Sequence, residues 1–231
     1  MSQPNFGIVV FPGSNCDHDA FYVAEKIFNC NTKFLWHKET DIKDIDIVIL
    51  PGGFSYGDYL RPGAISRFSP IMNAVKNFAD KGGLIVGICN GFQILVETGL
   101  LPGGLMRNIS LKYICKFVNL KITSTNSKFT NQYKKDETIE IPIAHGDGNY
   151  FASEDTINEL LDNDQIIFQY CDASGNTTPE SNPNGSMINI AGICNKQRNV
   201  LGMMPHPERA SDKELGYKDG YKFFESIIKN F

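Results

Sequence analysis

The sequence of 231 residues predicts a single-domain α/β protein with a mixed, mostly parallel sheet flanked by helices. Three observations support this prediction. In the first hundred residues, short apolar runs alternate with segments of helical periodicity, which is typical of a parallel sheet covered on both faces. In the second half, strand-like runs follow one another with few helical segments between them, which indicates added antiparallel strands. No repeat and no convincing linker divides the chain, so we expect residues 1–231 to form one domain.

The first half is expected to alternate strands and helices in order. Apolar runs predict strands over 6–11, 33–36, 45–50 and 84–88. A helix is expected after the first strand, with helical spacing of Phe21, Ala24, Ile27 and Phe28. A second helix is expected before the last of these strands, with apolar residues every three to four positions at Ile65, Phe68, Met72, Val75 and Phe78. The Lys81-Gly82-Gly83 sequence should end it.

The second half is expected to be mainly strands. Apolar runs predict strands over 113–123, 138–144, 166–171, 187–194 and 200–204. Residues 123–137 are polar and rich in turn-forming residues, so we expect an exposed excursion there. A last helix is expected from the helical spacing of Tyr217, Tyr221, Phe224, Ile228 and Phe231.

Composition and charge exclude several classes of partner. The formal net charge is -4 and the basic residues are scattered, so we expect neither a nucleic acid nor a membrane surface as partner. The apolar run near the start is too short for a signal peptide or a membrane span, which makes the cytoplasm the expected location. The six cysteines form no CxxC pair, so free thiols are expected, with no metal site.

A cysteine lies between two glycines where an apolar strand should turn into a helix. Gly87-Ile88-Cys89-Asn90-Gly91 has the form of a nucleophile elbow. The unpaired N–H groups and the positive dipole end of a helix would stabilise a thiolate at this corner. The alternative is that Cys89 is a small buried apolar side chain, as most free cysteines are.

A nucleophilic cysteine needs a base and a residue that orients the base. Of the four histidines, His206 suits this role, because it follows an apolar strand and precedes Glu208 by two residues. His18 and His37 are interpreted as a solvated side chain and a polar strand end. We therefore expect a Cys89–His206–Glu208 catalytic triad at the carboxyl edge of the sheet.

The oxyanion of an acyl-transfer reaction needs two N–H donors. The N–H of Asn90 is one candidate, by the geometry of the elbow. The second is expected from Gly52 and Gly53, which follow a predicted parallel strand and allow close approach of the backbone. A simple strand exit could also use this Gly-Gly pair.

These features resemble the class I glutamine amidotransferases and, among them, the family of glutaminase subunits of phosphoribosylformylglycinamidine synthase. The segments that carry the resemblance span nearly the whole chain, over 11–17, 50–63, 87–95, 100–116, 182–193 and 202–209. The resemblance implies the class I glutamine amidotransferase fold. It also implies hydrolysis of L-glutamine to L-glutamate and ammonia through a thioester on Cys89. The ammonia would serve conversion of formylglycinamide ribonucleotide to formylglycinamidine ribonucleotide in de novo purine biosynthesis.

The same resemblance implies residues and partners. Gln93 would contact the substrate, and the loop of Asn184, Gly185 and Ser186 would recognise the α-amino and carboxylate groups of glutamine. The partners would be a separate synthase subunit and a small bridging subunit. The chain lacks a GxxxxGK phosphate loop, so ATP and Mg would be used by the synthase subunit and no cofactor is expected here. For His145, contact with the synthase and stabilisation of a turn both remain open.

Two other functions fit parts of the pattern. Cysteine peptidases and chaperone-like relatives of the same fold also use a cysteine elbow, but they resemble each other in placing a histidine directly after the cysteine, where this chain has Asn90. An inactive binding subunit would be favoured by the loss of a triad residue, and none is missing.

Overall fold

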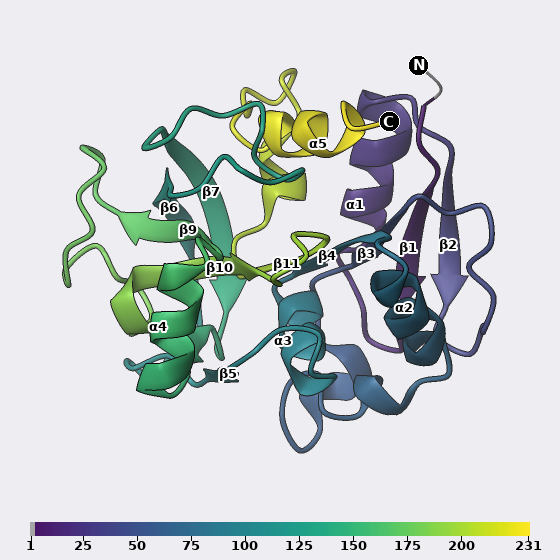
Figure 1. The fold of residues 1–231 in the computed structure, drawn as a ribbon, viewed down its shortest axis with the longest axis horizontal. Helices are drawn as coiled ribbons and strands as arrows, with labels where there is room; N and C mark the ends of the chain where they lie inside the picture. Colours follow the sequence, from purple (N-terminus) through teal and green to yellow (C-terminus); the bar gives the residue numbers. More distant parts are fainter. Residues whose placement is uncertain (1–2) are drawn as a thin grey trace.

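A nine-stranded mixed sheet forms the centre of the molecule, in a computed structural model that describes residues 3–231 (Figure 1). Its strands lie in the order β2, β1, β3, β4, β11, β10, β9, β6, β7. Their bounds are β1 Phe6–Val10, β2 Thr32–Trp36, β3 Ile47–Leu50, β4 Leu84–Ile88, β6 Ile114–Ile122, β7 Thr138–His145, β9 Ile166–Cys171, β10 Ile190–Cys194 and β11 Val200–Met203. Two short strands, β5 (Gly104–Met106) and β8 (Asn149–Phe151), pair separately.

The sheet divides into a parallel and an antiparallel part. Strands β2, β1, β3, β4 and β11 run parallel to one another. Strands β10, β9, β6 and β7 are paired antiparallel. Strands β3 and β4 are buried at every position, which explains their continuous apolar sequences. The predicted α/β class with a mixed sheet is confirmed.

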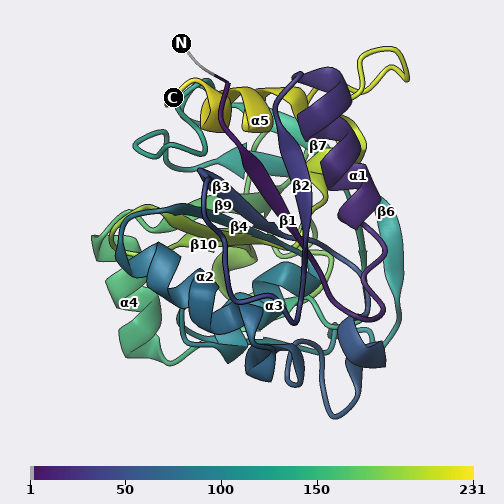
Figure 2. The ribbon, with the colours of Figure 1, turned by 90° about the vertical axis from the view of Figure 1, so that its right-hand side faces the viewer.

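Helices cover both faces of this sheet. The α-helices are α1 Asp17–Tyr22, α2 Ile71–Asp80, α3 Asn90–Glu97, α4 Glu154–Asp162 and α5 Tyr221–Ile228. A π-helical turn, Val23–Ile27, continues α1. Figures 1 and 2 show α1 and α5 on one side of the sheet and α2, α3 and α4 on the other. Among residues 3–231, no helix has the length and apolar character needed to cross a membrane.

The helix predicted from the spacing of Ile65 to Phe78 is wrong in its first part. A short 3₁₀ helix, Ser66–Phe68, is followed by an extended Ser69, and α2 begins only after Pro70. Proline disfavours the helical conformation of the residue before it, which explains the break at Ser69. As a result, Phe68 is exposed despite its helical spacing.

The expected exposed excursion over 123–137 is also wrong in part. Phe129 and Thr130 are fully buried, and the buried Tyr133 donates from its hydroxyl to the Asp219 carbonyl at 2.9 Å. Two aromatic side chains, Phe129 and Tyr133, thus anchor this mainly polar segment. The average composition of the segment does not indicate their burial.

Three further boundaries differ from expectation. The predicted strand over 187–194 starts at Ile190, after a 3₁₀ turn. Tyr217 precedes the last helix and stacks on Phe117 at 5.3 Å between ring centroids. Helix α4 was not predicted, although Ser153 caps it by accepting a hydrogen bond from the Thr156 N–H at 3.3 Å.

Candidate active site

The candidate site forms where four neighbouring parallel strands end. Strands β1, β3, β4 and β11 are adjacent in the sheet, so the segments that follow them meet at one edge. These segments carry Cys16 after β1, Gly52 after β3, Cys89 after β4 and His206 after β11. The fold therefore brings together residues that lie far apart in sequence.

Cys89 lies on a strained corner between β4 and α3. Its backbone has φ 50° and ψ -104°, a conformation that is costly for a residue with a side chain. Its N–H donates to the Met203 carbonyl at 2.7 Å, which ties the corner to the neighbouring strand. A Cβ on Gly91 would collide with the Leu50 carbonyl oxygen, so the helix could not pack this closely with a larger residue there. The predicted nucleophile elbow is confirmed.

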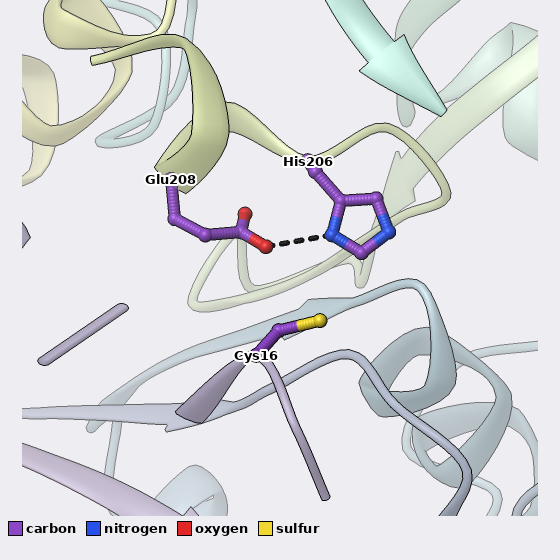
Figure 3. Close-up of side chains that lie close together, drawn as sticks. All are labelled: Cys16, His206 and Glu208. Carbon is purple, nitrogen blue, oxygen red and sulfur yellow. Dashed lines mark hydrogen bonds and ion pairs between the residues drawn. The ribbon is translucent and has the colours of Figure 1, made fainter. Parts of the chain in front are cut away.

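His206 and Glu208 form a buried pair beside this corner (Figure 3). The Nδ1 atom of His206 lies 2.6 Å from Oε1 of Glu208. Because a carboxylate accepts, this short bond places a proton on Nδ1 and leaves Nε2 for exchange with the nucleophile. His206 Nε2 has no hydrogen-bond partner among residues 3–231. The backbone N–H of His206 donates to the Pro142 carbonyl of β7 at 2.9 Å, which fixes the start of the loop.

The electrostatic environment favours the charged form of His206. Burial alone would lower the pKa of this imidazole, but the Glu208 charge and the nearby Cys89 and Cys16 sulfurs raise the pKa well above its usual value. An imidazolium held in this way can neutralise a thiolate on Cys89 and can donate a proton to a leaving group.

The expected oxyanion donors flank the nucleophile. The Asn90 N–H opens α3 and so has no intrahelical acceptor. The Cys16 N–H donates to the Gly52 carbonyl at 3.2 Å. Since the carbonyl and N–H of one trans peptide point in opposite directions, this bond turns the Gly53 N–H away from Cys16. Gly53 forms an isolated antiparallel bridge with Ser14, and its N–H remains the second candidate oxyanion donor.

Gly52 lies against both His206 and Cys89. A Cβ at this position would stand 2.7 Å from Cε1 of His206, 3.0 Å from Sγ of Cys16 and 3.4 Å from Cβ of Cys89. The absence of a side chain therefore allows the imidazole to approach the end of β3.

The residues expected to contact glutamine form hydrogen bonds with the loop of residues 145–148. Gln93 donates from Nε2 to the Asp147 carbonyl at 2.7 Å. Asn184 Nδ2 and Ser186 Oγ donate to the Gly148 carbonyl, at 2.8 Å and 3.2 Å. Gly185, between them, has a positive φ of 89°. These bonds place the loop of residues 145–148 beside α3, and the contacts with substrate remain a prediction.

His145 is held by Asn108, a residue that the sequence analysis did not select. Asn108 Nδ2 donates to the carbonyls of Lys112 and His145, so its Oδ1 must accept from Gly148 N–H and from Nδ1 of His145, each at 3.1 Å. Burial and the His206 charge lower the pKa of His145 to about 4, so this imidazole is neutral at pH 7. The turn-stabilising interpretation of His145 is supported by these bonds.

The other two histidines lie in different surroundings. His37 Nδ1 bonds the Tyr56 hydroxyl at 2.8 Å, and the His18 ring packs edge-on against Phe34 at 5.1 Å. Neither bonds a residue of the triad, as expected from the sequence.

One set of side chains has the chemistry of a metal site. The ligand atoms of Cys16, His206 and Glu208 lie within 4.8 Å of one another. However, the 2.6 Å between His206 and Glu208 is a direct hydrogen bond, which leaves no room for an ion between those atoms. All six cysteines are free thiols.

Comparison with known proteins agrees with the fold. Residues 3–217 match the family described as CobB/CobQ-like glutamine amidotransferase domain. A glutamine amidotransferase from Thermotoga maritima shares the fold, with a TM-score of 0.57 at 16% identity over 99% of this chain and 92% of that one. The fold and the family match thus define a class I glutamine amidotransferase.

Closer relatives specify the family. The chain is 57% identical to the phosphoribosylformylglycinamidine synthase subunit PurQ of Koribacter versatilis, over 96% of both sequences. It is 55% identical to the subunit of the same name in Acaryochloris marina, over 97% of this chain and 96% of the relative. A structure of PurLQS from Thermotoga maritima matches with a TM-score of 0.87 at 43% identity, over 99% of each chain. The chain belongs to the family of PurQ subunits of phosphoribosylformylglycinamidine synthase.

Proposed function

We propose that this chain hydrolyses L-glutamine to L-glutamate and ammonia, and that the ammonia is used by a synthase subunit to make formylglycinamidine ribonucleotide. The main support is the position of Cys89 on a strained elbow beside the buried His206–Glu208 pair. A nucleophile, a base and a residue that orients the base are the parts that amide hydrolysis through a covalent intermediate requires.

In the first half of the reaction, the Cys89 thiolate attacks the side-chain amide carbon of glutamine. Negative charge develops on the amide oxygen, where the N–H groups of Asn90 and Gly53 are the candidate donors. His206, held protonated by Glu208, gives its Nε2 proton to the departing nitrogen. The carbon–nitrogen bond breaks, ammonia leaves, and a thioester remains on Cys89.

In the second half, His206 acts as a base. Its neutral Nε2 takes a proton from a water molecule, which attacks the thioester carbon. The tetrahedral intermediate collapses, L-glutamate leaves and the Cys89 thiolate re-forms beside an imidazolium. Glu208 holds the ring throughout through the 2.6 Å bond to Nδ1.

The proposed partners are a synthase subunit and a small bridging subunit. The support is the structural match to a PurLQS complex. ATP and Mg are proposed to act on the synthase, because the sequence contains no GxxxxGK phosphate loop. The cytoplasm is the proposed location, which fits the free thiols of all six cysteines.

Replacement of the nucleophile tests this function. We expect Cys89→Ser to reduce glutamine hydrolysis by at least about 10³-fold, because a serine hydroxyl in this site is a much weaker nucleophile than a thiolate. Synthesis supported by free ammonia in the reconstituted complex should be unchanged. The measurements are glutamate release and product formation with glutamine or with ammonium as nitrogen donor.

The exposed Cys115 provides the matched control. Cys115→Ser should behave as the wild type with both nitrogen donors. Glutamate release by Cys89→Ser at the wild-type rate would show that another group is the nucleophile.

A further inference from the structure

A second cysteine touches the catalytic pair. Figure 3 shows Cys16 beside the His206 ring, and its sulfur lies within 4.8 Å of ligand atoms of both His206 and Glu208. Cys16 is buried and donates from Sγ to Oδ1 of Asn15 at 3.4 Å, so its thiol proton is used in this bond. Burial raises the pKa of this thiol. Cys16 is therefore a neutral thiol whose sulfur can still accept a hydrogen bond.

The hydrogen bond that this sulfur accepts comes from Arg209. The Arg209 Nη2 atom lies 3.1 Å from Sγ of Cys16, and Nε donates to Oδ2 of Asp19 at 3.2 Å. A guanidinium ordinarily prefers a carboxylate to a thiol, because charge-assisted bonds to oxygen are stronger. Here a carboxylate is available nearby, since Glu208 is the preceding residue in the chain.

Glu208 has an oxygen to offer. Its Oε1 is bonded to His206, and its buried Oε2 has no hydrogen-bond partner among residues 3–231. The Glu208 charge is close enough to Arg209 to be among the causes that raise the pKa of this guanidinium. Nevertheless the guanidinium is bonded to Cys16 and Asp19, and Cys16 lies within reach of both Arg209 and Glu208.

We propose that Cys16 is a positioning residue which keeps Arg209 from pairing with Glu208, so that the full Glu208 charge acts on His206. The thiol at Nη2 and Asp19 at Nε hold the guanidinium in a position in which it makes no hydrogen bond to Oε2 of Glu208. A guanidinium paired with Glu208 would withdraw charge from the His206–Glu208 bond and would weaken the imidazolium. This role rests on the proposed glutaminase reaction, in which that imidazolium donates the proton to ammonia.

Charged and titratable groups lie around His206 on several elements. Glu208 and Arg209 lie on its own loop, and Cys16 and Asp19 lie on the segment after β1. Cys89 faces it from the end of β4, and His145 and Tyr113 respond to its charge from the β7 end and the loop before β6. Substitution of Cys16 leaves the other groups in place but also removes the contact of its sulfur with His206, so a variant at Arg209 is needed to assign a change in pH dependence to the guanidinium.

The test compares variants by their pH profiles in the reconstituted complex. Activity should fall as pH rises through the pKa of His206, because the neutral imidazole cannot protonate the leaving ammonia. In Cys16→Ala, Arg209 is free to pair with Glu208, and the midpoint of this basic limb of kcat/KM should move down by about one pH unit. In Cys16→Ser the hydroxyl accepts from Arg209, and the midpoint should stay at the wild-type value.

A double variant assigns the effect to the guanidinium. In Cys16→Ala with Arg209→Met, no cation can reach Glu208, and the midpoint should move back toward the wild-type value. A midpoint that stays at the value of Cys16→Ala would overturn the proposal, as would an unchanged midpoint in Cys16→Ala. Cys194→Ala, which removes another buried thiol, serves as the control for loss of packing.

A second readout does not depend on glutamine. Iodoacetamide alkylates the thiolate form of Cys89, which the His206 imidazolium stabilises. The pH dependence of the alkylation rate should therefore shift in Cys16→Ala and not in Cys16→Ser. If the wild type failed to hydrolyse glutamine, the proposed function would fail while this measurement still decided the role of Cys16.

Discussion

The two buried histidines near Cys89, His206 and His145, make the same kind of hydrogen bond through Nδ1 but differ in charge. Both carry a hydrogen on Nδ1, because Glu208 accepts from His206 and Asn108 accepts from His145. Both leave Nε2 without a partner among residues 3–231. Their charges differ, since the pKa of His206 is raised well above its usual value and that of His145 is lowered to about 4. The imidazole of His206 is therefore held in its charged form, while that of His145 is held in its neutral form.

His145 should make the fold sensitive to acid. Its folded pKa of about 4 lies below the ordinary 6.5, so below pH 6.5 the unfolded chain binds a proton that the folded chain does not. Stability is then lost as pH falls from 6.5 toward 4. His145→Gln has no such proton, so between pH 7 and pH 5 the wild type should lose about 2 kcal/mol more unfolding free energy than the variant. Urea titrations at both pH values measure this difference.

The comparison isolates His145 because every other group titrates in both proteins. Asp58, whose pKa is raised to about 6 by burial and by the Asp147 charge, acts with the opposite sign and cancels in the difference. Equal losses in the two proteins would mean that His145 is already protonated in the folded state.

At the scale of elements, the segments after β1 and β3 interlock. The Cys16 N–H donates to Gly52 at 3.2 Å, the Phe54 N–H donates to Gly13 at 3.1 Å, and the Tyr56 N–H donates to Pro12 at 2.6 Å. The first segment therefore holds the candidate oxyanion turn in place while it presents Cys16 to His206. This arrangement explains why a motif after the first strand contributes to a site centred on the fourth.

Gly52→Ala should damage the site more than the fold. The new Cβ would stand 2.7 Å from Cε1 of His206, so the ring must shift away from the nucleophile. Since a misplacement of about 1 Å costs about 10²-fold in rate, we expect kcat for glutamine to fall by about that factor with a smaller change in KM. Gly104→Ala is the matched control, because its Cβ would meet no atom closer than 3.9 Å. Wild-type kcat in Gly52→Ala would show that the imidazole does not depend on this contact.

The sequence correctly predicts those elements that are marked by one strong local pattern, such as an apolar run or a pair of glycines. The continuous apolar runs of β3 and β4 predict strands buried on both faces, and the glycines around Cys89 predict the elbow. The break at Ser69 is also local, since Pro70 is visible in the sequence, but the periodicity of Ile65 to Phe78 outweighed it. The burial of Phe129 depends on contacts with distant segments, which no local pattern contains.

In the site, too, the contacts between residues close in the sequence were predicted, and the contacts between distant residues were not. His206 and Glu208 are adjacent to an apolar strand and stand two residues apart, so their pairing follows from local geometry. Cys16 lies 190 residues from His206, and only the order of β1, β3, β4 and β11 in the sheet brings it to the ring. The bond of Asn108 to His145, 37 residues away, also has no local signal, because an asparagine in a loop is an ordinary turn residue.

At the scale of the molecule, exposed apolar side chains gather on two loops that flank the site. Exposed apolar residues of the loop after β3 and of the loop between β5 and β6 include Phe54, Tyr59, Leu60, Ile109, Leu111 and Tyr113. Phe54 and Tyr113 connect the two loops, with ring centroids 6.5 Å apart. Asn90 bonds the first loop at Asp58, and Asn184 bonds the second at Ile109. Apolar surface of this kind marks contact with another protein.

If the proposed synthase subunit covers these loops, charges placed there should uncouple the two activities. Leu60 and Leu111 are 79% and 73% exposed, so Leu60→Asp and Leu111→Asp should leave the fold unchanged. Each should weaken binding to the synthase by about 10-fold or more, since a buried unpaired charge at an interface costs several kcal/mol. Glutamine-dependent synthesis should then fall, while synthesis from free ammonia stays constant. Leu161→Asp, on α4 and 53% exposed in the wild type, is the control. Calorimetric titration of each variant with the synthase measures the affinity, and wild-type affinity in both loop variants would place the interface on another face of the molecule.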